Sequence, residues 1–300
     1  MNFKNQAVNG FSSIIIPVFK DYKGLKTTLE SLQKQDIDKT KYEIIVCNDG
    51  GDINISKICD MYQVTEVLIP TNMGSYYARN RGLEQAKGEY IGFVDADIAV
   101  NPSWVRLGIQ SLSHADYVTG PVEIDSSKAH TLIEKFEVYT ALNMEYYFNN
   151  NHFAPTANLW IKRELLLYNA AFDERLWSSG DKEFGERLYG TGEYKFYFEN
   201  SLSVIHPPRN YQDLLKKTKR VAQGVIFLKK LYPQRYSQAT IGKCLYKAFF
   251  KPWKLTLKKD CNFFLKVVFY IIQRWNCFLH YYYMIQYLIK YGKKGVSLWD

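Results

Sequence analysis

The feature that most constrains the fold is a regular alternation of short apolar runs and amphipathic stretches in the first third of the chain. Ser12–Phe19 (SSIIIPVF) and Tyr42–Cys47 (YEIIVC) are β-branched runs typical of buried strands. Between them, three leucines within residues 21–35 recur at i, i+4 and i+7, which places them on one face of a helix. The alternation continues with an expected helix at Ile53–Tyr62, a strand at Val64–Ile69, a helix at Gly74–Lys87 and a strand at Glu89–Val94. It predicts an α/β fold with a mostly parallel, Rossmann-like sheet flanked by helices.

Acidic residues follow two of the expected strands directly. Asp49 comes after the second strand, and Asp95 and Asp97 come after the fourth. Ligands of parallel sheets bind beyond the carboxyl ends of the strands. We therefore expect these three carboxylates to lie on one rim of the sheet.

Each acidic motif allows a chemical interpretation and a structural one. The carboxylates of Asp95-Ala96-Asp97 can share one Mg²⁺ or Mn²⁺ ion, or the turn can simply cap the next helix. Asp49, in Asn48-Asp49-Gly50-Gly51, can accept a hydrogen bond from a nucleobase N–H or a ribose hydroxyl. The same four residues also suit an ordinary turn.

Two further candidates lie downstream. Asp181 opens a predicted helix, where the helix N-terminus favours the ionised carboxylate, and it can accept a proton or act only as a cap. His206 follows a short strand and is either a third ligand of the metal or a core or surface histidine. Another helix is expected at Leu132–Tyr147.

Several enzyme classes are excluded by missing motifs. The chain contains no G-x-G-x-x-G, G-x-x-x-x-G-K-[ST], H-E-x-x-H or G-x-S-x-G sequence. This argues against a dinucleotide-dependent dehydrogenase, a P-loop kinase, a zinc protease and a serine hydrolase. The five cysteines form no C-x-x-C pair, so neither a disulfide framework nor a zinc knuckle is expected.

Basic charge is concentrated at the end of the chain. Residues 210–300 hold 18 basic and 3 acidic residues, a net charge of +15, whereas residues 1–209 carry a net charge of −6. Residues 244–291 combine this charge with many aromatic and aliphatic side chains, and no apolar piece is long enough to span a bilayer. We expect a basic, aromatic helical extension at 236–300, after a catalytic domain at 1–235. It either lies on an anionic membrane surface or packs on the core, and nucleic-acid binding is not expected.

The first residues lack the apolar region of a secretory signal, so a cytoplasmic protein, peripheral at the inner face of the membrane, is expected.

Four segments, taken in order, resemble glycosyltransferase family 2, whose members use nucleotide sugars and have the GT-A fold. The segments are SIIIPVFKDYKGLKTTLESL, YEIIVCNDGG, NMGSYYARNRGLEQAKGEYIGFVDAD and SSGDKEFGERL. They extend from Ser13 to about Pro208, two thirds of the chain. The segment from Asn72 to Asp97 is the most specific of the four.

The resemblance implies a role for each matching residue. Pro17 and Phe19 would line the nucleotide pocket, with Asp21 beside it, and Asp49 would recognise the base, most often uracil. Arg79 would approach the nucleotide or its phosphates, and Asp95 the ribose. Asp97 would hold Mn²⁺ or Mg²⁺. Asp181 would be the catalytic base.

The resemblance also implies an inverting transfer of sugar from a nucleotide diphospho-sugar, most often a UDP-sugar, to a hydroxyl of a glycan or lipid-linked acceptor in cell-surface polysaccharide synthesis. The Q-x-x-R-W sequence of processive synthases is missing from its usual place, which favours transfer of one sugar. Gly180 stands where the family usually has Glu before Asp181. The alternative is an inactive GT-A-like scaffold that binds membrane or a partner through its basic tail.

Overall fold

The computed structural model describes residues 7–250 and 255–291, which form two compact units. The sheet unit comprises residues 7–124, 142–174 and 181–207. The helical unit comprises residues 125–141, 175–180 and the described part of 208–300. The boundary expected at residue 235 falls between two helices of the helical unit, and the division into a catalytic domain at 1–235 and an extension at 236–300 stays a prediction.

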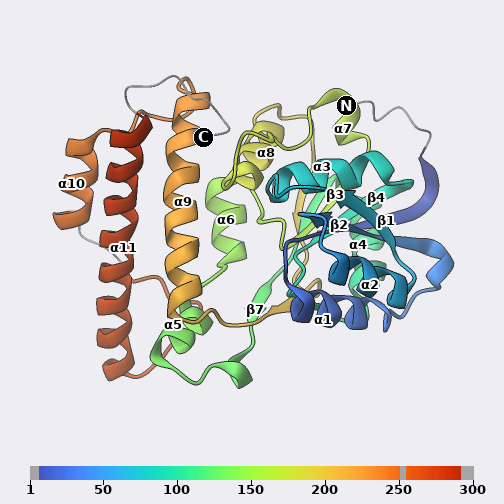
Figure 1. Cartoon of the computed structure of the whole chain (residues 1–300), viewed down its shortest axis with the longest axis horizontal. Helices are drawn as coiled ribbons and strands as arrows, with labels where there is room; N and C mark the ends of the chain where they lie inside the picture. Colours follow the sequence, from blue (N-terminus) through green and yellow to red (C-terminus); the bar gives the residue numbers. More distant parts are fainter. Residues whose placement is uncertain (1–6, 251–254, 292–300) are drawn as a thin grey trace. The chain divides into compact units, whose positions relative to one another are not determined.

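The sheet unit is built on one large sheet and one small one (Figure 1). The described strands are β1 (Val8–Val18), β2 (Tyr42–Asp49), β3 (Thr65–Ile69), β4 (Gly88–Val94), β5 (Ala99–Val100), β6 (Tyr117–Thr119), β7 (Val122–Ile124), β8 (Asn158–Lys162), β9 (Phe196–Phe198) and β10 (Val204–His206). Among the described residues, the large sheet has seven strands in the order β3-β2-β1-β4-β8-β6-β9, and the small sheet has the order β5-β10-β7.

Most of the large sheet is parallel. Strand β1 pairs in parallel with β2 and β4, and β2 does so with β3, whereas β8 is antiparallel to both of its neighbours. The helices of this unit are α1 (Tyr22–Leu32), η1 (Lys39–Lys41), α2 (Ile53–Tyr62), α3 (Ser75–Gln85), α4 (Trp104–Leu112), α6 (Met144–Asn151), α7 (Leu165–Tyr168) and α8 (Gly180–Tyr189). The predicted α/β fold with a mostly parallel sheet flanked by helices is confirmed.

The core of the sheet unit explains the apolar run near the start of the chain. Ile14, Ile15 and Ile16 in β1 are fully buried, as expected for the centre of a sheet covered on both faces. Pro17 comes after Ile15, the last β1 residue paired with β4, at the carboxyl end of the strand where a missing N–H is tolerated. The apolar run therefore supplies the core, and its last residues lead to the rim.

Helix α3 lies unusually close to strands β1 and β2. A Cβ atom on Gly82 would come within 2.7 Å of both Cys47 Sγ and Ile15 Cγ2, and both of these residues are fully buried. Only a glycine allows this approach. This close packing fixes the distance between α3 and the sheet. It therefore also determines which groups the polar side chains of α3 can contact.

The small sheet brings together two parts of the chain that are far apart in sequence. Strand β10 is antiparallel to β5, with Val204 opposite Val100 and Ile205 opposite Ala99. The next step of this register places His206 opposite residue 98, one residue after Asp97. Backbone pairing therefore places His206 beside the turn between β4 and β5.

The helical unit contains η2 (Ser126–Lys128), α5 (Leu132–Thr140), α9 (Tyr211–Leu231), α10 (Ile241–Phe249) and α11 (Phe263–Tyr291). Helix α11 packs against α9 and α10 around a small core that includes Ala222, Cys244 and Met284 (Figure 1). The predicted helical character of the basic tail is confirmed for the part of it that the structure describes. In the described part of the chain, no helix combines the length and the apolar character that crossing a membrane requires.

The single helix expected at Leu132–Tyr147 is wrong, because two helices occupy this stretch. Helix α5 ends at Thr140, and Leu142 adopts a left-handed conformation with a φ of 49° that an α-helix cannot contain. Asn143 then caps α6 by accepting a hydrogen bond from the Tyr146 amide at 3.2 Å.

Replacing Gly82 by Ala is expected to destabilise the protein by about 1–3 kcal/mol, because the added methyl group overpacks a rigid interior. The matched control is Gly242→Ala in α10, where a Cβ atom meets nothing within 4 Å. That change is expected to be neutral or to stabilise by about 0.5–1 kcal/mol, since Ala is the better helix former. Urea unfolding of the two variants measures both values, and equal stability would refute the close approach of α3.

Candidate functional site

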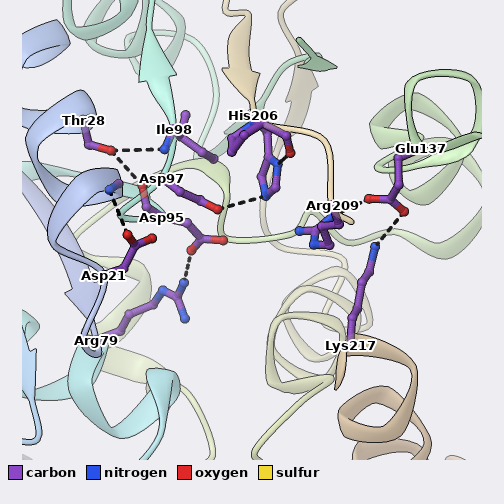
Figure 2. A network of polar contacts seen from close by, with 12 residues as sticks. Asp21, Thr28, Arg79, Asp95, Asp97, Ile98, Glu137, His206, Arg209 and Lys217 are labelled. Atoms are coloured by element: carbon purple, nitrogen blue, oxygen red, sulfur yellow. Dashed lines mark hydrogen bonds and ion pairs between the residues drawn. The ribbon is translucent and has the colours of Figure 1, made fainter. Parts of the chain in front are cut away.

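The turn after β4 is held in place by helix α1. The Ile98 amide donates to the Asp95 carbonyl oxygen at 3.3 Å and to Thr28 Oγ1 at 3.1 Å, and Thr28 Oγ1 donates to the Asp95 carbonyl oxygen at 3.4 Å (Figure 2). One buried threonine thus satisfies backbone groups at both ends of the turn. These hydrogen bonds hold the backbone of the turn, which presents the side chains of Asp95 and Asp97, each about a third exposed.

Asp95 is paired with Arg79. Arg79 Nη2 donates to Asp95 Oδ1 at 2.5 Å, and the arginine side chain is only 3% exposed (Figure 2). A buried guanidinium needs such a partner, because an unpaired charge in the protein interior is costly. Arg79 lies in α3, so this ion pair connects the middle of α3 to the turn after β4.

Asp97 faces His206 across the same rim. Asp97 Oδ2 and His206 Nε2 are 3.5 Å apart, longer than an ordinary hydrogen bond (Figure 2). His206 Nδ1 lies 2.5 Å from the carbonyl oxygen of Pro207, a contact in which the ring N–H donates. In the neutral imidazole with its proton on Nδ1, the other ring nitrogen, Nε2, carries a lone pair. An oxygen and a nitrogen that can both ligate a metal therefore face each other.

These two side chains fit one divalent cation. A carboxylate oxygen and an imidazole nitrogen are both ligands of Mn²⁺, and a separation of 3.5 Å suits two ligands of a single ion. Among the described residues, no group of three or more His, Cys, Asp or Glu side chains is arranged to hold a metal. The remaining ligands of such a cation would have to come from water or from the oxygens of a bound substrate.

Asp181 lies in the first turn of α8. Its Oδ1 accepts hydrogen bonds from Tyr76 Oη at 3.0 Å and from the Lys182 amide at 2.9 Å. Burial raises the pKa of the Asp181 carboxyl, and the nearby Asp95 adds to this effect, whereas the two hydrogen bonds and Arg79 oppose it. A raised pKa makes this carboxylate a better proton acceptor.

Asp49 is more deeply buried than the motif alone implied. Its two carboxylate oxygens accept hydrogen bonds from the amides of Met73 at 2.7 Å and Gly74 at 2.9 Å, just before α3 begins. Burial nevertheless raises the pKa of the Asp49 carboxyl. Asp49 therefore holds the backbone immediately before the first residue of α3.

The residues after β1 surround the same rim. Phe19 is 46% exposed, and its ring lies so close to Gly50 that a Cβ there would come within 2.9 Å of it. Asp21 caps α1 by accepting from the Gly24 amide at 2.8 Å, and a Cβ on Gly24 would come within 2.7 Å of the Ala96 carbonyl oxygen. Asp21 thus lies beside the turn that carries Asp95 and Asp97.

Most of the predicted site residues therefore gather at one rim of the sheet unit, and their chemical roles stay predictions. Sequence reasoning missed Tyr76 and Thr28. Tyr76 precedes Arg79 by three positions on the expected helix, a spacing that puts both side chains on one face, so a signal was present for it. No comparable signal pointed to Thr28.

Comparisons with known proteins agree with this architecture. The sequence pattern of Glycosyl transferase family 2 matches residues 13–167. The glycosyltransferase AglE of Haloferax volcanii is 30% identical over 223 residues, covering 72% of this chain and 73% of that protein. The chondroitin synthase of Escherichia coli is 30% identical over 250 residues, 68% of this chain, but the match spans only 36% of that longer enzyme.

Solved structures share the fold at lower identity. The mannosyltransferase PcManGT from Pyrobaculum calidifontis, in complex with GDP-Man and Mn²⁺, aligns with a TM-score of 0.62 at 13% identity, covering 98% of this chain and 90% of that one. TarS 1-349 of S. aureus, in complex with UDP-GlcNAc, aligns with a TM-score of 0.55 at 22% identity, covering 72% and 66%. The match to the family pattern and the archaeal relative confirm the resemblance inferred from the four segments: this chain belongs to glycosyltransferase family 2.

Proposed function

We propose that this protein transfers one sugar from a nucleotide diphospho-sugar to a hydroxyl of a glycan or lipid-linked acceptor, with inversion at the anomeric carbon. A UDP-sugar is the donor that we propose first. The observation that carries the proposal is the set of contacts that α3 makes. Tyr76 on α3 bonds Asp181, and Arg79, one turn further, bonds Asp95. The carboxylate proposed as base and the carboxylates proposed to face the nucleotide are thereby held around one helix.

Asp181 is proposed to take the proton of the acceptor hydroxyl. The oxygen then forms a bond to the anomeric carbon on the face opposite the diphosphate, and the bond from that carbon to the diphosphate oxygen breaks. Attack from the opposite face inverts the configuration. The raised pKa of the Asp181 carboxyl and its hydrogen bond from Tyr76 support this role, because they tune and orient a single base. Holding both substrates in line supplies much of the remaining acceleration.

The nucleotide is proposed to bind at the rim formed by the ends of β1, β2 and β4. The exposed ring of Phe19 offers a stacking surface beside Gly50, and Pro17 and Asp21 flank it. Asp49, Arg79 and Asp95 are proposed to contact the base, the phosphates and the ribose. The nucleotide sugars bound to the mannosyltransferase and to TarS support a nucleotide-sugar donor here.

Asp97 and His206 are proposed to hold Mn²⁺ or Mg²⁺ together with the diphosphate. The ion would offset negative charge on the departing diphosphate. The pair supplies only two ligands, so the site is expected to be complete only when nucleotide is bound. The Mn²⁺ in the mannosyltransferase complex supports this assignment.

The helical unit is proposed to lie on the inner face of an anionic membrane, which would bring the enzyme to a lipid-linked acceptor in cell-surface polysaccharide synthesis. Exposed apolar side chains repeat at helical spacing along α11, at Phe263, Val267, Ile271 and Trp275. They continue onto α10 through ring contacts of Phe278, whose centroid lies 5.8 Å from Trp275 and 5.6 Å from Phe249. The net charge of +15 in this part of the chain would attract anionic lipid.

Asp181→Asn is expected to lower kcat about 10²–10⁴-fold, because an amide cannot take the proton. Nucleotide affinity is expected to stay unchanged. The assay is release of nucleotide from UDP-, GDP- and dTDP-sugars with Mn²⁺ or Mg²⁺, first with water as acceptor. Full turnover in the variant would remove Asp181 from the mechanism, and a wild-type protein that neither turns over nor binds any of these sugars would favour an inactive scaffold.

A base at Asp181 makes the activity depend on pH. The Tyr76 hydrogen bond lowers the pKa of Asp181, so Tyr76→Phe is expected to raise that pKa further. A base works only when deprotonated, and activity is lost as pH falls through its pKa. The acidic limb of kcat should therefore move to higher pH in Tyr76→Phe. It should not move in Tyr77→Phe, whose ring packs under Arg81 instead.

Asp97→Ala is expected to abolish the gain in nucleotide affinity that Mn²⁺ gives the wild-type protein, since one of the two protein ligands is lost. Calorimetric titration of UDP with and without Mn²⁺ measures this directly and needs no turnover. Met61→Ala, a change at an exposed side chain of α2, serves as control. An equal Mn²⁺ effect in wild type and Asp97→Ala would contradict the assignment.

Replacing Phe263 and Ile271 on α11 together by Glu is expected to weaken binding to vesicles containing anionic lipid roughly 100-fold, since burying each side chain is worth about 1.5–3 kcal/mol. Co-sedimentation with phosphatidylglycerol vesicles measures the effect. The control variant Met61→Glu also replaces an exposed apolar side chain, on α2, and it should bind like the wild type. Unchanged binding of the α11 variant would rule out this face as the membrane contact.

A further inference from the structure

Lys20, the residue that follows Phe19, has a strained backbone. Its φ is 55°, in the left-handed region that favours glycine, and it lies in the bend between the end of β1 and the start of α1. A strained residue persists only where the surrounding structure holds it, and such residues gather at ligand sites. Lys20 lies at the rim where the nucleotide is proposed to bind, so binding is a function that this strain can serve.

The ammonium group of Lys20 lies over the ring of Phe19. Its Nζ is 5.3 Å from the ring centroid, which is within the range of a cation–π contact. The ring is 46% exposed, and its Cε2 and Cδ2 atoms lie against Gly50. Because Lys20 is exposed as well, its contact with the ring is weak and readily exchanged. The lysine therefore covers part of the stacking surface proposed for the base.

A carboxylate close to this bend is engaged by groups other than Lys20. Asp52 Oδ2 accepts a hydrogen bond from Tyr22 Oη at 2.5 Å, and its Oδ1 accepts one from the Asn54 amide at 2.9 Å. These two hydrogen bonds account for most of the lowering of the Asp52 pKa, and the charge of Lys20 contributes least. In the described part of the chain, no hydrogen bond or ion pair joins the Lys20 side chain to a carboxylate. Its N–H donors are therefore available to a ligand.

Asp49 and Lys20 offer opposite hydrogen-bonding groups at the same rim. The Asp49 side chain is 3% exposed, and its oxygens already accept from the amides of Met73 and Gly74. An ionised carboxylate has no hydrogen to donate, so Asp49 can serve only an N–H of a base. A carbonyl oxygen of the same base needs a donor from elsewhere, and the Lys20 ammonium is such a donor.

We propose that Lys20 recognises the base of the donor by donating a hydrogen bond to the carbonyl oxygen of a stacked uracil or guanine. This inference rests on the proposed nucleotide site. When the base stacks on Phe19, the ammonium leaves the ring and moves to the edge of the base. Adenine and cytosine present an amino group where guanine and uracil present that oxygen, and an amino group cannot accept from an ammonium. Lys20 therefore selects against these two bases.

The test is calorimetric titration of UDP and of CDP into the full chain with Mn²⁺. The two nucleotides differ only in the base, where cytosine has an amino group in place of one carbonyl oxygen of uracil. Lys20→Met is expected to weaken UDP about tenfold, because one charge-assisted hydrogen bond is lost, and to leave CDP no weaker. Lys26→Met removes the same charge from an exposed position of α1 and should change neither affinity.

Lys20→Gly separates recognition from stability. Glycine adopts a left-handed backbone without strain, so the thermal midpoint without nucleotide should rise by about 1–3 °C while UDP weakens as in Lys20→Met. A purely structural lysine would not give this combination.

Two results would overturn the proposal while leaving the nucleotide site in place. One is UDP binding that Lys20→Met does not weaken, and the other is an equal loss for UDP and CDP, which would put Lys20 on a group that both nucleotides share. If the wild type prefers GDP, the comparison of GDP with ADP replaces that of UDP with CDP. A wild-type protein that binds none of these nucleotides would overturn the proposed nucleotide site, and the role of Lys20 with it.

Discussion

The hydrogen bonds and the ion pair made by helix α3 organise the sheet unit of this protein. The amides before its first turn bond Asp49 at the end of β2, Tyr76 bonds Asp181 at the start of α8, and Arg79 bonds Asp95 after β4. Three carboxylates from distant parts of the sequence are thereby held by one helix. The helix is itself placed by its close contact with β1 and β2 at Gly82. A change in the distance between α3 and the sheet would therefore displace the hydrogen-bond partners of all three carboxylates at once.

Burial and hydrogen bonding have opposite effects on the pKa of two of these carboxylates, Asp49 and Asp181. Asp49 and Asp181 are held by amide and hydroxyl donors, yet burial raises the pKa of both. Asp95 instead meets the full charge of Arg79 and remains more than a third exposed. The three carboxylates therefore lie in different surroundings: Asp49 and Asp181 accept hydrogen bonds from neutral donors, whereas Asp95 is paired with a charged side chain.

The helical unit follows a different principle. Its small core lies between α9, α10 and α11, and other apolar side chains are exposed along α10 and α11. Basic residues outnumber acidic ones in residues 210–300, and two cations, Arg209 and Lys217, lie beside the buried Glu137. The exposed apolar side chains and the positive charge are the basis of the proposed membrane contact.

The sequence by itself determined the alternation of strands and helices, the position of the acidic turns at strand ends and the family, because these depend on local periodicity and on short motifs. It could not determine the break at Leu142, the link between Tyr76 and Asp181, or the approach of His206 to Asp97. Each of these depends on backbone pairing or packing between residues that are distant in the chain, and no local pattern encodes such contacts. The sequence also placed Glu137 and Lys217 80 positions apart, and only the packing of the helical unit brings their side chains together.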